Sequence, residues 1–236
     1  MDTFIYTTAG GREENQDVAV KFERGSNGIF IVADGLGGHR LGNLASEAVA
    51  QQFASAWNDD SDTFGKDGLF KRIEDAHEAV LLLQKERNCS AKSTLVVLWI
   101  VGNKALWANT GDSRLYYIRG KKLHTITEDH SVAFKKFKAG EITREQIATD
   151  EDQSSLLRAL GSGRWKPEIS EQVKVGRGDA FLLCSDGIWE YVTDEEILRD
   201  CLETRTAEAW AKKLLGRAET RFTTDHDNAS MITVRI

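Results

Sequence analysis

Four aspartates lie at the ends of apolar segments of this chain, and three of them adjoin a glycine. They are Asp34, Asp112, Asp186 and Asp227. Next to glycine at a strand end, the backbone can approach an ion closely and a short carboxylate can be held in a fixed direction. If these ends converge, the carboxylates repel one another unless cations lie between them. No cluster of cysteine and histidine accompanies them, so the expected cations are hard ones, Mg²⁺ or Mn²⁺. We therefore predict a carboxylate-bridged site for two metal ions, a kind of site that does phosphoester chemistry.

A turn is the simpler explanation for any one of these sequences, because turns favour aspartate and glycine for backbone reasons that need no ion. Four such positions, each beside an apolar segment, are harder to explain as turns. The upstream sequence Asn15-Gln16-Asp17 adds a further carboxylate. The combination favours the metal site.

Composition limits the class of protein. The chain has 236 residues, a net charge of −6 and an isoelectric point of about 5.5. This charge argues against nucleic acid or an anionic membrane as the main partner. The longest apolar run, Leu95 to Val101, is too short to span a bilayer, and the N-terminus lacks the pattern of a signal peptide. Three unpatterned cysteines indicate a reducing compartment. We expect a cytoplasmic protein with no nucleic-acid partner and no membrane insertion, and nothing in the sequence requires more than a monomer.

Apolar periodicity predicts a chain rich in strands, with helices grouped between them. Strand patterns, several of them joined by short glycine turns, cover residues 17–23, 28–33, 93–101, 104–109, 115–119, 122–125, 168–175, 179–185 and 230–236. Helix patterns cover residues 41–57, 69–84, 193–202 and 207–222. This grouping indicates an α+β fold, with a central antiparallel β-sandwich of two sheets flanked by helix pairs on both outer faces.

We expect one domain over residues 1–236, since no low-complexity linker or repeat interrupts the chain. Residues 129–167 differ from the rest, because they mix charge with short helical patterns and carry few large apolar residues. One of those patterns is a possible capping box at Thr143. We predict a mobile flap at this segment, although an ordinary surface excursion would have the same sequence features.

The motifs together carry a family resemblance. The chain resembles the metal-dependent protein phosphatases of the PPM family, the type 2C class, in their compact bacterial form. Each motif is short, but their order and spacing are specific, and they cover essentially the whole chain. In chain order they are Arg12-Glu-Glu-Asn-Gln-Asp17, Asp34-Gly-Leu-Gly-Gly-His39, Thr110-Gly-Asp-Ser-Arg114, Asp129-His-Ser131, Leu157-Arg-Ala-Leu-Gly161, Ser185-Asp-Gly187 and Asp227-Asn-Ala-Ser-Met-Ile-Thr-Val234. The family fold is a β-sandwich with helices on both outer faces, which agrees with the pattern of elements above.

The resemblance implies which residues hold the metals. Asp34 would bridge two ions, with the carbonyl oxygen of Gly35 on one of them. Asp186 and Asp227 would complete the other. Asp112 would face Asp186 and hold a third, weaker ion, as in bacterial members of the family. The cofactors implied are therefore Mn²⁺ or Mg²⁺, with two core ions and a third at Asp112.

The resemblance also implies roles for Arg12 and Asp17. Arg12 would bind the substrate phosphate through its planar fork of donors and balance charge in the transition state. Asp17 would support the metal ligands from behind, or bind the second ion through water. Two cations sharing Asp34 would lower the pKa of a bridging water toward neutrality. The resulting hydroxide would attack phosphorus in line with the leaving serine or threonine oxygen.

Several residues depart from the family pattern or have simpler explanations. Gln16 stands where many relatives carry glutamate, and a neutral amide binds a hard cation more weakly, so we expect weaker metal binding. Eukaryotic relatives place a histidine directly after the Asp-Gly pair, where this chain has Leu36. His39 is therefore expected to be structural rather than a general acid. For His226, support of the metal ligands and packing at a strand end both stay open. We interpret His77, on an apolar helix face, as a buried histidine with satisfied hydrogen bonds.

The resemblance therefore implies an enzyme, a Mg²⁺- or Mn²⁺-dependent phosphatase that hydrolyses phosphoserine and phosphothreonine on proteins. Its partners would be phosphorylated proteins and, by family analogy alone, a serine/threonine kinase whose action it reverses. Two alternatives stay open, a pseudophosphatase that binds phosphoprotein without turnover and a metal-dependent hydrolase of small phosphoesters. Against the first, Arg12 and all four core aspartates are present. The relative activity on phosphopeptides and on sugar or nucleotide phosphates would separate the second.

Overall fold

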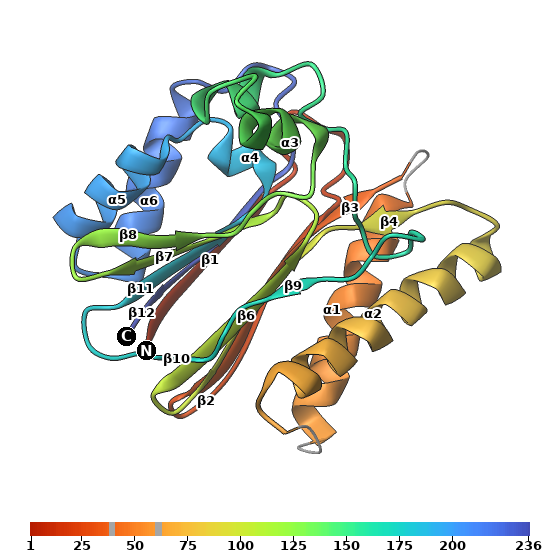
Figure 1. Ribbon diagram of the computed structural model, residues 1–236, viewed down its shortest axis with the longest axis horizontal. Coiled ribbons are helices and arrows are strands. Elements are labelled where there is room, and N and C mark those ends of the chain that lie inside the picture. The colour runs from red at the N-terminus through yellow and green to blue at the C-terminus, as the bar shows by residue number, and fades with distance from the viewer. Residues whose placement is uncertain (38–40, 60–62) are drawn as a thin grey trace.

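The computed structural model describes residues 1–37, 41–59 and 63–236 of the protein. Its centre is a pair of antiparallel sheets packed face to face (Figure 1). The first sheet has five strands in the order β1-β12-β11-β7-β8. These strands are β1 Asp2–Thr8, β7 Arg114–Arg119, β8 Lys122–Ile126, β11 Ala180–Cys184 and β12 Ala229–Arg235.

The second sheet has seven strands, five of which follow the order β10-β6-β5-β3-β2. Two short strands extend it, because β4 pairs with β3 and β9 pairs with β6. Its strands are β2 Asp17–Arg24, β3 Asn27–Leu36, β4 Lys92–Ser93, β5 Leu95–Val101, β6 Lys104–Thr110, β9 Glu168–Ile169 and β10 Val173–Lys174.

The central strands are apolar on both faces because both faces are covered. Successive side chains of a strand point to opposite faces of its sheet. On β3, Phe30 and Val32 therefore pack in the core between the sheets, together with Phe181 of β11. Their neighbours Ile29 and Ile31 pack on the opposite face, in a second buried cluster. This continuous burial explains why the strand sequences are unbroken apolar runs rather than alternating ones.

Helices cover the outer face of each sheet, so the chain forms four layers (Figure 1). The seven-stranded sheet is covered by α1 Gly42–Asp59 and α2 Lys66–Arg87. The five-stranded sheet is covered by α5 Asp194–Glu203 and α6 Ala207–Glu219, with α3 Val132–Ala139 and α4 Asp186–Trp189 toward one end. The predicted fold class is thus confirmed. Within the described ranges, no helix is both long and apolar enough to cross a membrane.

Some elements differ from the sequence prediction. β1 is absent from the strands predicted from the sequence. It pairs with β12 along its whole length, from Asp2 opposite Arg235 to Thr8 opposite Ala229. Its partner lies at the other end of the chain, so no local turn marks it as a strand. The strand predicted over 93–101 is interrupted at Thr94, whose backbone N–H donates to the carbonyl of Asp34 instead (2.8 Å). The strand predicted over 168–175 is two short strands that pair with separate parts of β6.

Residues 129–167 form short elements across one end of the sandwich. Their first part, around α3 in Figure 1, lies over the five-stranded sheet, whereas Leu160 is buried on the side of the seven-stranded sheet. After α3 the chain makes a 3₁₀ helix over Glu145–Thr149. Half of the predicted capping box forms, because the backbone N–H of Thr143 donates to Gln146 Oε1 at 2.7 Å. Ile147 is buried against the helical side of that sheet. The segment is therefore anchored at this point, and its mobility stays a prediction.

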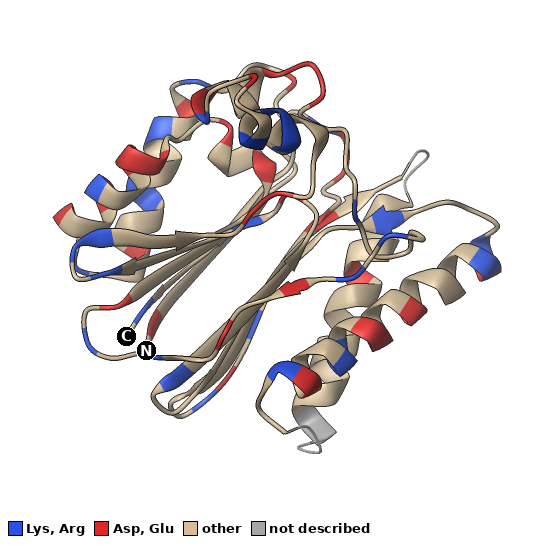
Figure 2. Cartoon of the chain, in the orientation of Figure 1, with Lys and Arg blue, Asp and Glu red and all other residues tan. Residues whose placement is uncertain are grey.

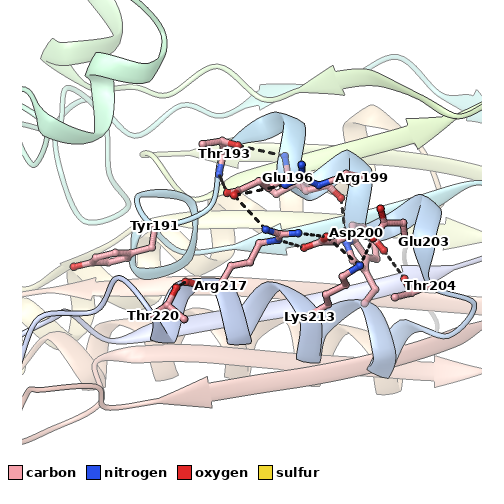
Figure 3. A network of polar contacts seen from close by, with 12 residues as sticks. Tyr191, Thr193, Glu196, Arg199, Asp200, Glu203, Thr204, Lys213, Arg217 and Thr220 are labelled. Carbon is pink, nitrogen blue, oxygen red and sulfur yellow. Dashed lines mark hydrogen bonds and ion pairs between the residues drawn. The ribbon is translucent and has the colours of Figure 1, made fainter.

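A network of ion pairs joins α5 to α6 (Figure 3). Glu196 accepts hydrogen bonds from both terminal nitrogens of Arg221, at 2.7 and 2.6 Å, and one from Arg217 at 3.3 Å. Arg217 also donates to the fully buried Asp200 at 2.8 Å. Glu196 completes a capping box with Thr193, as predicted. The hydrogen bonds from Arg221 are the main reason that the pKa of Glu196 falls to about 2.

This network predicts a pH-dependent contribution to stability. Replacement Glu196→Gln should lower the free energy of unfolding at pH 7 by on the order of 3 kcal/mol, since each pKa unit corresponds to about 1.4 kcal/mol. Because the folded pKa is depressed, the contribution is present above the unfolded value of 4.5 and is lost as the pH falls through about 2. Urea unfolding of both proteins between pH 7 and pH 2 measures the difference.

The matched control is Glu208→Gln, which removes an exposed i,i+4 pair with Lys212 and should change stability by about 0.5 kcal/mol or less. A difference between wild type and Glu196→Gln that stayed constant down to pH 2 would contradict the electrostatic explanation.

Candidate metal centre

Five aspartates from both sheets meet at one end of the sandwich. In the seven-stranded sheet, Asp17 begins β2 and lies opposite Asp34 near the end of β3, and Asp112 follows β6. In the five-stranded sheet, Asp186 follows β11 and Asp227 precedes β12. Because β11 and β12 are antiparallel neighbours, the end of one strand lies beside the start of the other. The convergence expected from the sequence is therefore present.

The electrostatics of this cluster are those of like charges that are close together and removed from water. Burial, followed by repulsion from Asp17, Asp186, Asp112 and Asp227 in that order, holds the pKa of Asp34 well above its usual value of 3.8. Burial raises the pKa of Asp17 to about 7, and burial together with the charge of Asp227 raises the pKa of Asp186 to about 6. Burial is also the main reason that the pKa of Asp112 is raised, and the charge of Asp186 is the next largest. A cation in the cluster would remove this repulsion.

The chemistry of the donors fits Mn²⁺ or Mg²⁺. The cluster offers carboxylate oxygens, and Asp17 Oδ1 is buried without a hydrogen-bond partner. These hard cations prefer such oxygen donors. In the described part of the chain, no three acidic, histidine or cysteine side chains already form a group that could hold one ion. The carboxylates are thus neighbours, but in these positions no three of them form a complete set of ligands for one ion.

The backbone around Asp34 and Gly35 is held by Ser93 and Thr94, the residues between which β4 ends and the chain continues into β5. Asp34 N–H donates to Thr94 Oγ1 at 2.9 Å, and its carbonyl accepts from Ser93 Oγ at 3.1 Å. A Cβ on Gly35 would lie 2.0 Å from the carbonyl oxygen of Gly42, at the start of α1. Only glycine lets these two backbone segments approach so closely. The glycine of this motif is therefore required for packing, whether or not its carbonyl binds an ion.

Asp112 is held from the opposite side by buried aromatic residues. Gly111 before it has φ +97°, a left-handed conformation that favours glycine. The N–H of Gly111 donates to His130 Nδ1 at 3.1 Å, and Trp189 Nε1 donates to the carbonyl of Asp112 at 3.0 Å. Arg114 lies over the ring of Trp189, 3.6 Å from its centroid. The loop that carries Asp112 is therefore fixed by residues from α4 and from the start of the 129–167 segment.

Two residues near the cluster were not singled out by sequence reasoning. Ser185 Oγ donates to Asp17 Oδ2 at 2.7 Å and accepts from the backbone N–H of Ser230 at 3.0 Å, which links the two sheets. Glu190 is half-buried, and burial, with the charge of Asp186 next in importance, raises its pKa to about 8. Ser185 stands in a quoted motif, but only the tertiary structure gives its hydroxyl a partner. Nothing in the local sequence distinguishes Glu190 from a surface glutamate.

Arg12 lies in a pocket at the edge of the cluster. Its Nε and Nη2 donate to the two carboxylate oxygens of Asp227, at 3.2 and 3.1 Å. The loop of Arg12 is tied to this strand end, because Asn228 Nδ2 donates to the carbonyls of Ala9 and Glu14. The pocket has a volume of about 380 Å³ and is lined by Arg12, Glu13, Glu14, Gln16, Asp227 and Asn228. The structure thus brings the predicted phosphate-binding residue against a predicted metal ligand.

The histidines have separate roles. His77 is buried, accepts a hydrogen bond from the backbone N–H of Gly161 at 2.9 Å and stacks on Trp165, so its interpretation as a satisfied buried histidine is confirmed. His226 stacks on Phe222 with ring centroids 3.9 Å apart, which favours the packing interpretation. His39 lies outside the described residues.

The close contact at Gly35 predicts a large effect of a single methyl group. Replacement Gly35→Ala should destabilise the fold by about 1–3 kcal/mol or more, because the atoms that its Cβ would meet belong to the backbone and cannot rotate away. As a matched control, Gly216→Ala places a methyl group on the exposed face of α6, where nothing lies within 4 Å. That change should stabilise by about 0.5–1 kcal/mol. Urea unfolding of both variants distinguishes the two effects, and equal shifts would contradict the packing argument.

Comparison with known proteins identifies the family. Residues 10–220 match the family model described as Protein phosphatase 2C. The chain is 34% identical over 206 residues to Protein phosphatase PhpP of Streptococcus pneumoniae, a match that covers 84% of this chain and 82% of the relative.

Solved structures agree with this assignment. The fold is similar to that of the serine/threonine phosphatase PstP/Ppp of Mycobacterium tuberculosis, with a TM-score of 0.85, 27% sequence identity, and coverage of 99% of this chain and 97% of that one. It is also similar to the catalytic domain of serine threonine protein phosphatase PstP in complex with two manganese ions, with a TM-score of 0.83, 27% identity, and coverage of 98% and 96%. The chain therefore belongs to the protein phosphatase 2C family of metal-dependent serine/threonine protein phosphatases.

Proposed function

We propose that this protein removes phosphate from phosphoserine and phosphothreonine of protein substrates at the cluster of aspartates described above. The observation that carries this proposal is the convergence of Asp17, Asp34, Asp112, Asp186 and Asp227 at one end of the sandwich. Burial, and after it the charges of neighbouring aspartates, raise the pKa values of Asp17, Asp34, Asp112 and Asp186. Such a cluster is costly unless cations neutralise it, and the oxygen donors suit Mn²⁺ or Mg²⁺.

The residues that would hold the cations are Asp34, Gly35 through its carbonyl, Asp186 and Asp227, with Asp112 serving a third ion. When bound, two such cations activate water and neutralise charge that develops on phosphoryl oxygens. The protein's part is to keep these donors in place. The hydrogen bonds from Thr94 and Ser93 hold the backbone of Asp34 for this purpose.

Arg12 would bind the phosphate of the substrate. Its guanidinium already presents two donors side by side, to the two oxygens of Asp227, and this fork also matches two oxygens of a phosphate. The half-exposed side chain lies in a pocket open to solvent, where a phosphorylated side chain can reach it. Arg12 would thus orient the phosphoryl group and compensate its charge.

Asp17 and Gln16, at the edge of the aspartate cluster, would affect how the cluster binds metal. The hydrogen bond from Ser185 holds one oxygen of Asp17, which leaves the other oxygen toward the cluster for a water molecule or an ion. Gln16 lines the pocket of Arg12 with a neutral amide where many relatives carry a carboxylate. We therefore infer weaker binding of metal than in those relatives, with activity retained.

The substrates would be phosphorylated proteins, and by analogy with the family the partner in signalling would be a serine/threonine kinase. The protein is proposed to act as a cytoplasmic monomer. Turnover of a phosphopeptide, compared with sugar or nucleotide phosphates, separates the protein phosphatase from a hydrolase of small phosphoesters. Binding of phosphopeptide without turnover would instead indicate a pseudophosphatase.

The first test is phosphate release from a phosphothreonine peptide with Mn²⁺, with Mg²⁺ and with EDTA. We expect turnover with either metal and none with EDTA. Replacement Asp186→Asn should lower kcat/KM by at least about a hundredfold, since metal-based charge stabilisation is worth several kcal/mol and each 1.4 kcal/mol is a factor of ten. Isothermal titration with Mn²⁺ should show weaker binding in the same variant. Full activity and unchanged Mn²⁺ affinity in Asp186→Asn would remove this residue from the metal centre.

A second test concerns Arg12. Replacement Arg12→Ala should raise KM for the phosphopeptide about tenfold to a hundredfold, because a hydrogen bond to a charged group contributes about 1.5–3 kcal/mol. The ion pair with Asp227 is half-exposed on both sides, so its loss should change the stability of the fold by less than about 1 kcal/mol. Steady-state kinetics and thermal unfolding measure both quantities. An unchanged KM in a folded variant would exclude Arg12 from phosphate binding.

A further inference from the structure

A second pocket lies beside the metal centre, between β4 and the end of the 129–167 segment. It has a volume of about 480 Å³, and we call it the basic groove. Its lining residues are Leu36, Ser90, Lys92, Ser154, Leu156, Leu157, Arg158, Ala159, Ser162, Gly163 and Arg164. They include three cations and three serine hydroxyls but no acidic residue, in a chain whose net charge is −6.

The backbone that carries the cations is fixed on both sides of the groove. Ser93 and Leu160 exchange backbone hydrogen bonds of 3.2 and 2.8 Å, which join β4 to the loop after residue 158. The loop closes on itself, since Ala159 N–H donates to the carbonyl of Arg164 at 3.2 Å and Ser162 Oγ donates to the carbonyl of Ala159 at 2.8 Å. Lys92, next to Ser93, and Arg164 therefore project from segments whose separation is set by the fold.

The groove is directly continuous with the strand that carries Asp34. In the pairing of β3 with β4, Gly35 lies opposite Ser93 and Leu36 lies opposite Lys92. Lys92 is therefore only two residues along the sheet from the level of Asp34. An extended peptide advances about 3.3 Å per residue. A substrate whose phosphorylated residue reaches the aspartates would thus have neighbouring residues within a few positions of the groove.

The charges of the groove are not balanced by the protein itself. In the part of the chain that the structure describes, the side chains of Lys92 and Arg164 form no ion pair and no hydrogen bond. Arg158, by contrast, forms an ion pair with Glu168 at 3.7 Å and a hydrogen bond with His130 Nε2 at 3.2 Å. Figure 2 shows basic segments (blue) near the strand labelled β4 in Figure 1.

Two other pockets of the protein hold arginines that are paired with carboxylates. In the pocket under the 129–167 segment, each arginine faces a carboxylate, namely Arg144 with Asp194, Arg114 with Asp129 and Arg221 with Glu196. Arg12 is likewise paired with Asp227 in its own pocket. The adjoining pocket shares Arg158 and Arg164 with the groove, but its lining also includes Glu128, Asp129 and Glu168, whereas the lining of the basic groove has no carboxylate. The cations of the basic groove therefore attract an anionic ligand.

We propose that the basic groove binds an acidic segment of the protein substrate, a few residues from the phosphorylated residue that enters the metal centre. The anionic group would be a glutamate or aspartate carboxylate or a second phosphate, held by Lys92 and Arg164 with serine hydroxyls as further donors. This proposal rests on the proposed function and adds a preference among its substrates. The groove selects substrates by KM and takes no part in bond cleavage.

The test uses three phosphothreonine peptides of one sequence, with glutamates, with glutamines or with phosphoserines at the flanking positions. Wild type is compared with Lys92→Gln/Arg164→Gln. The matched control is Lys104→Gln/Arg177→Gln, which removes one lysine and one arginine at the opposite end of the sheets. Mass spectrometry follows loss of phosphate from threonine alone. Fluorescence anisotropy with an acidic peptide that lacks phosphate measures binding to the groove independently of turnover.

For wild type, we expect KM for the glutamate peptide to be about five- to thirtyfold below that for the glutamine peptide, the range for two charge-assisted surface contacts. In Lys92→Gln/Arg164→Gln this preference should fall to about one through KM rather than kcat, and it should persist in the control variant. The phosphoserine peptide reports whether a second phosphate is preferred to carboxylates.

Several outcomes would overturn the proposal. A glutamate preference that survives in Lys92→Gln/Arg164→Gln would do so, and so would its equal loss in Lys104→Gln/Arg177→Gln, which would indicate net charge alone. If wild type turned over none of the peptides, the proposed function would fail. The groove would then be judged by anisotropy, where equal affinity of wild type and Lys92→Gln/Arg164→Gln for the acidic peptide overturns it.

Discussion

Like charges confined to one end of a β-sandwich are the constraint on which the rest of this structure depends. Asp34 and Asp186 come from different sheets, yet the charge of Asp186 adds to burial in raising the pKa of Asp34, so the fold must hold them together against repulsion. The buried apolar residues between the sheets and under the helices supply the opposing free energy. Bound divalent cations would reduce the repulsion, which explains why the family depends on metal for activity.

Buried polar contacts hold the surroundings of the cluster. Arg114 and Asp129 form a buried ion pair with two hydrogen bonds of 2.8 and 2.6 Å, and Arg114 also lies over the ring of Trp189. Removing either partner would leave a buried charge without compensation. Because Trp189 in turn donates to the carbonyl of Asp112, one buried unit connects β7, the start of the 129–167 segment and a residue of the metal centre. The start of the 129–167 segment and the loop that carries Asp112 are therefore joined by one set of buried contacts.

Arginines between helices and cations beside the candidate metal centre have different surroundings. Where arginines stabilise the fold, as Arg217 and Arg221 do between α5 and α6, each faces a carboxylate. Beside the metal centre, by contrast, Lys92 and Arg164 face a groove without acidic lining. The relatives in the protein phosphatase 2C family share the fold over nearly the whole chain at 25–27% identity. Differences in substrate among such proteins are therefore expected to lie in surfaces around the shared site rather than in the aspartates.

The sequence by itself determined the local features of this protein. Periodicity predicted most strands and helices, Thr193 and Glu196 predicted a helix start, and aspartates beside glycine predicted strand ends able to hold ions. Only the tertiary structure decided how these parts meet. The pairing of β1 with β12 and the hydrogen bond from Ser185 to Asp17 join residues far apart in the chain. The interruption at Thr94 follows from its bond to Asp34, which lies on another strand. Local sequence encodes backbone preference, whereas contacts between distant segments depend on how the whole core packs.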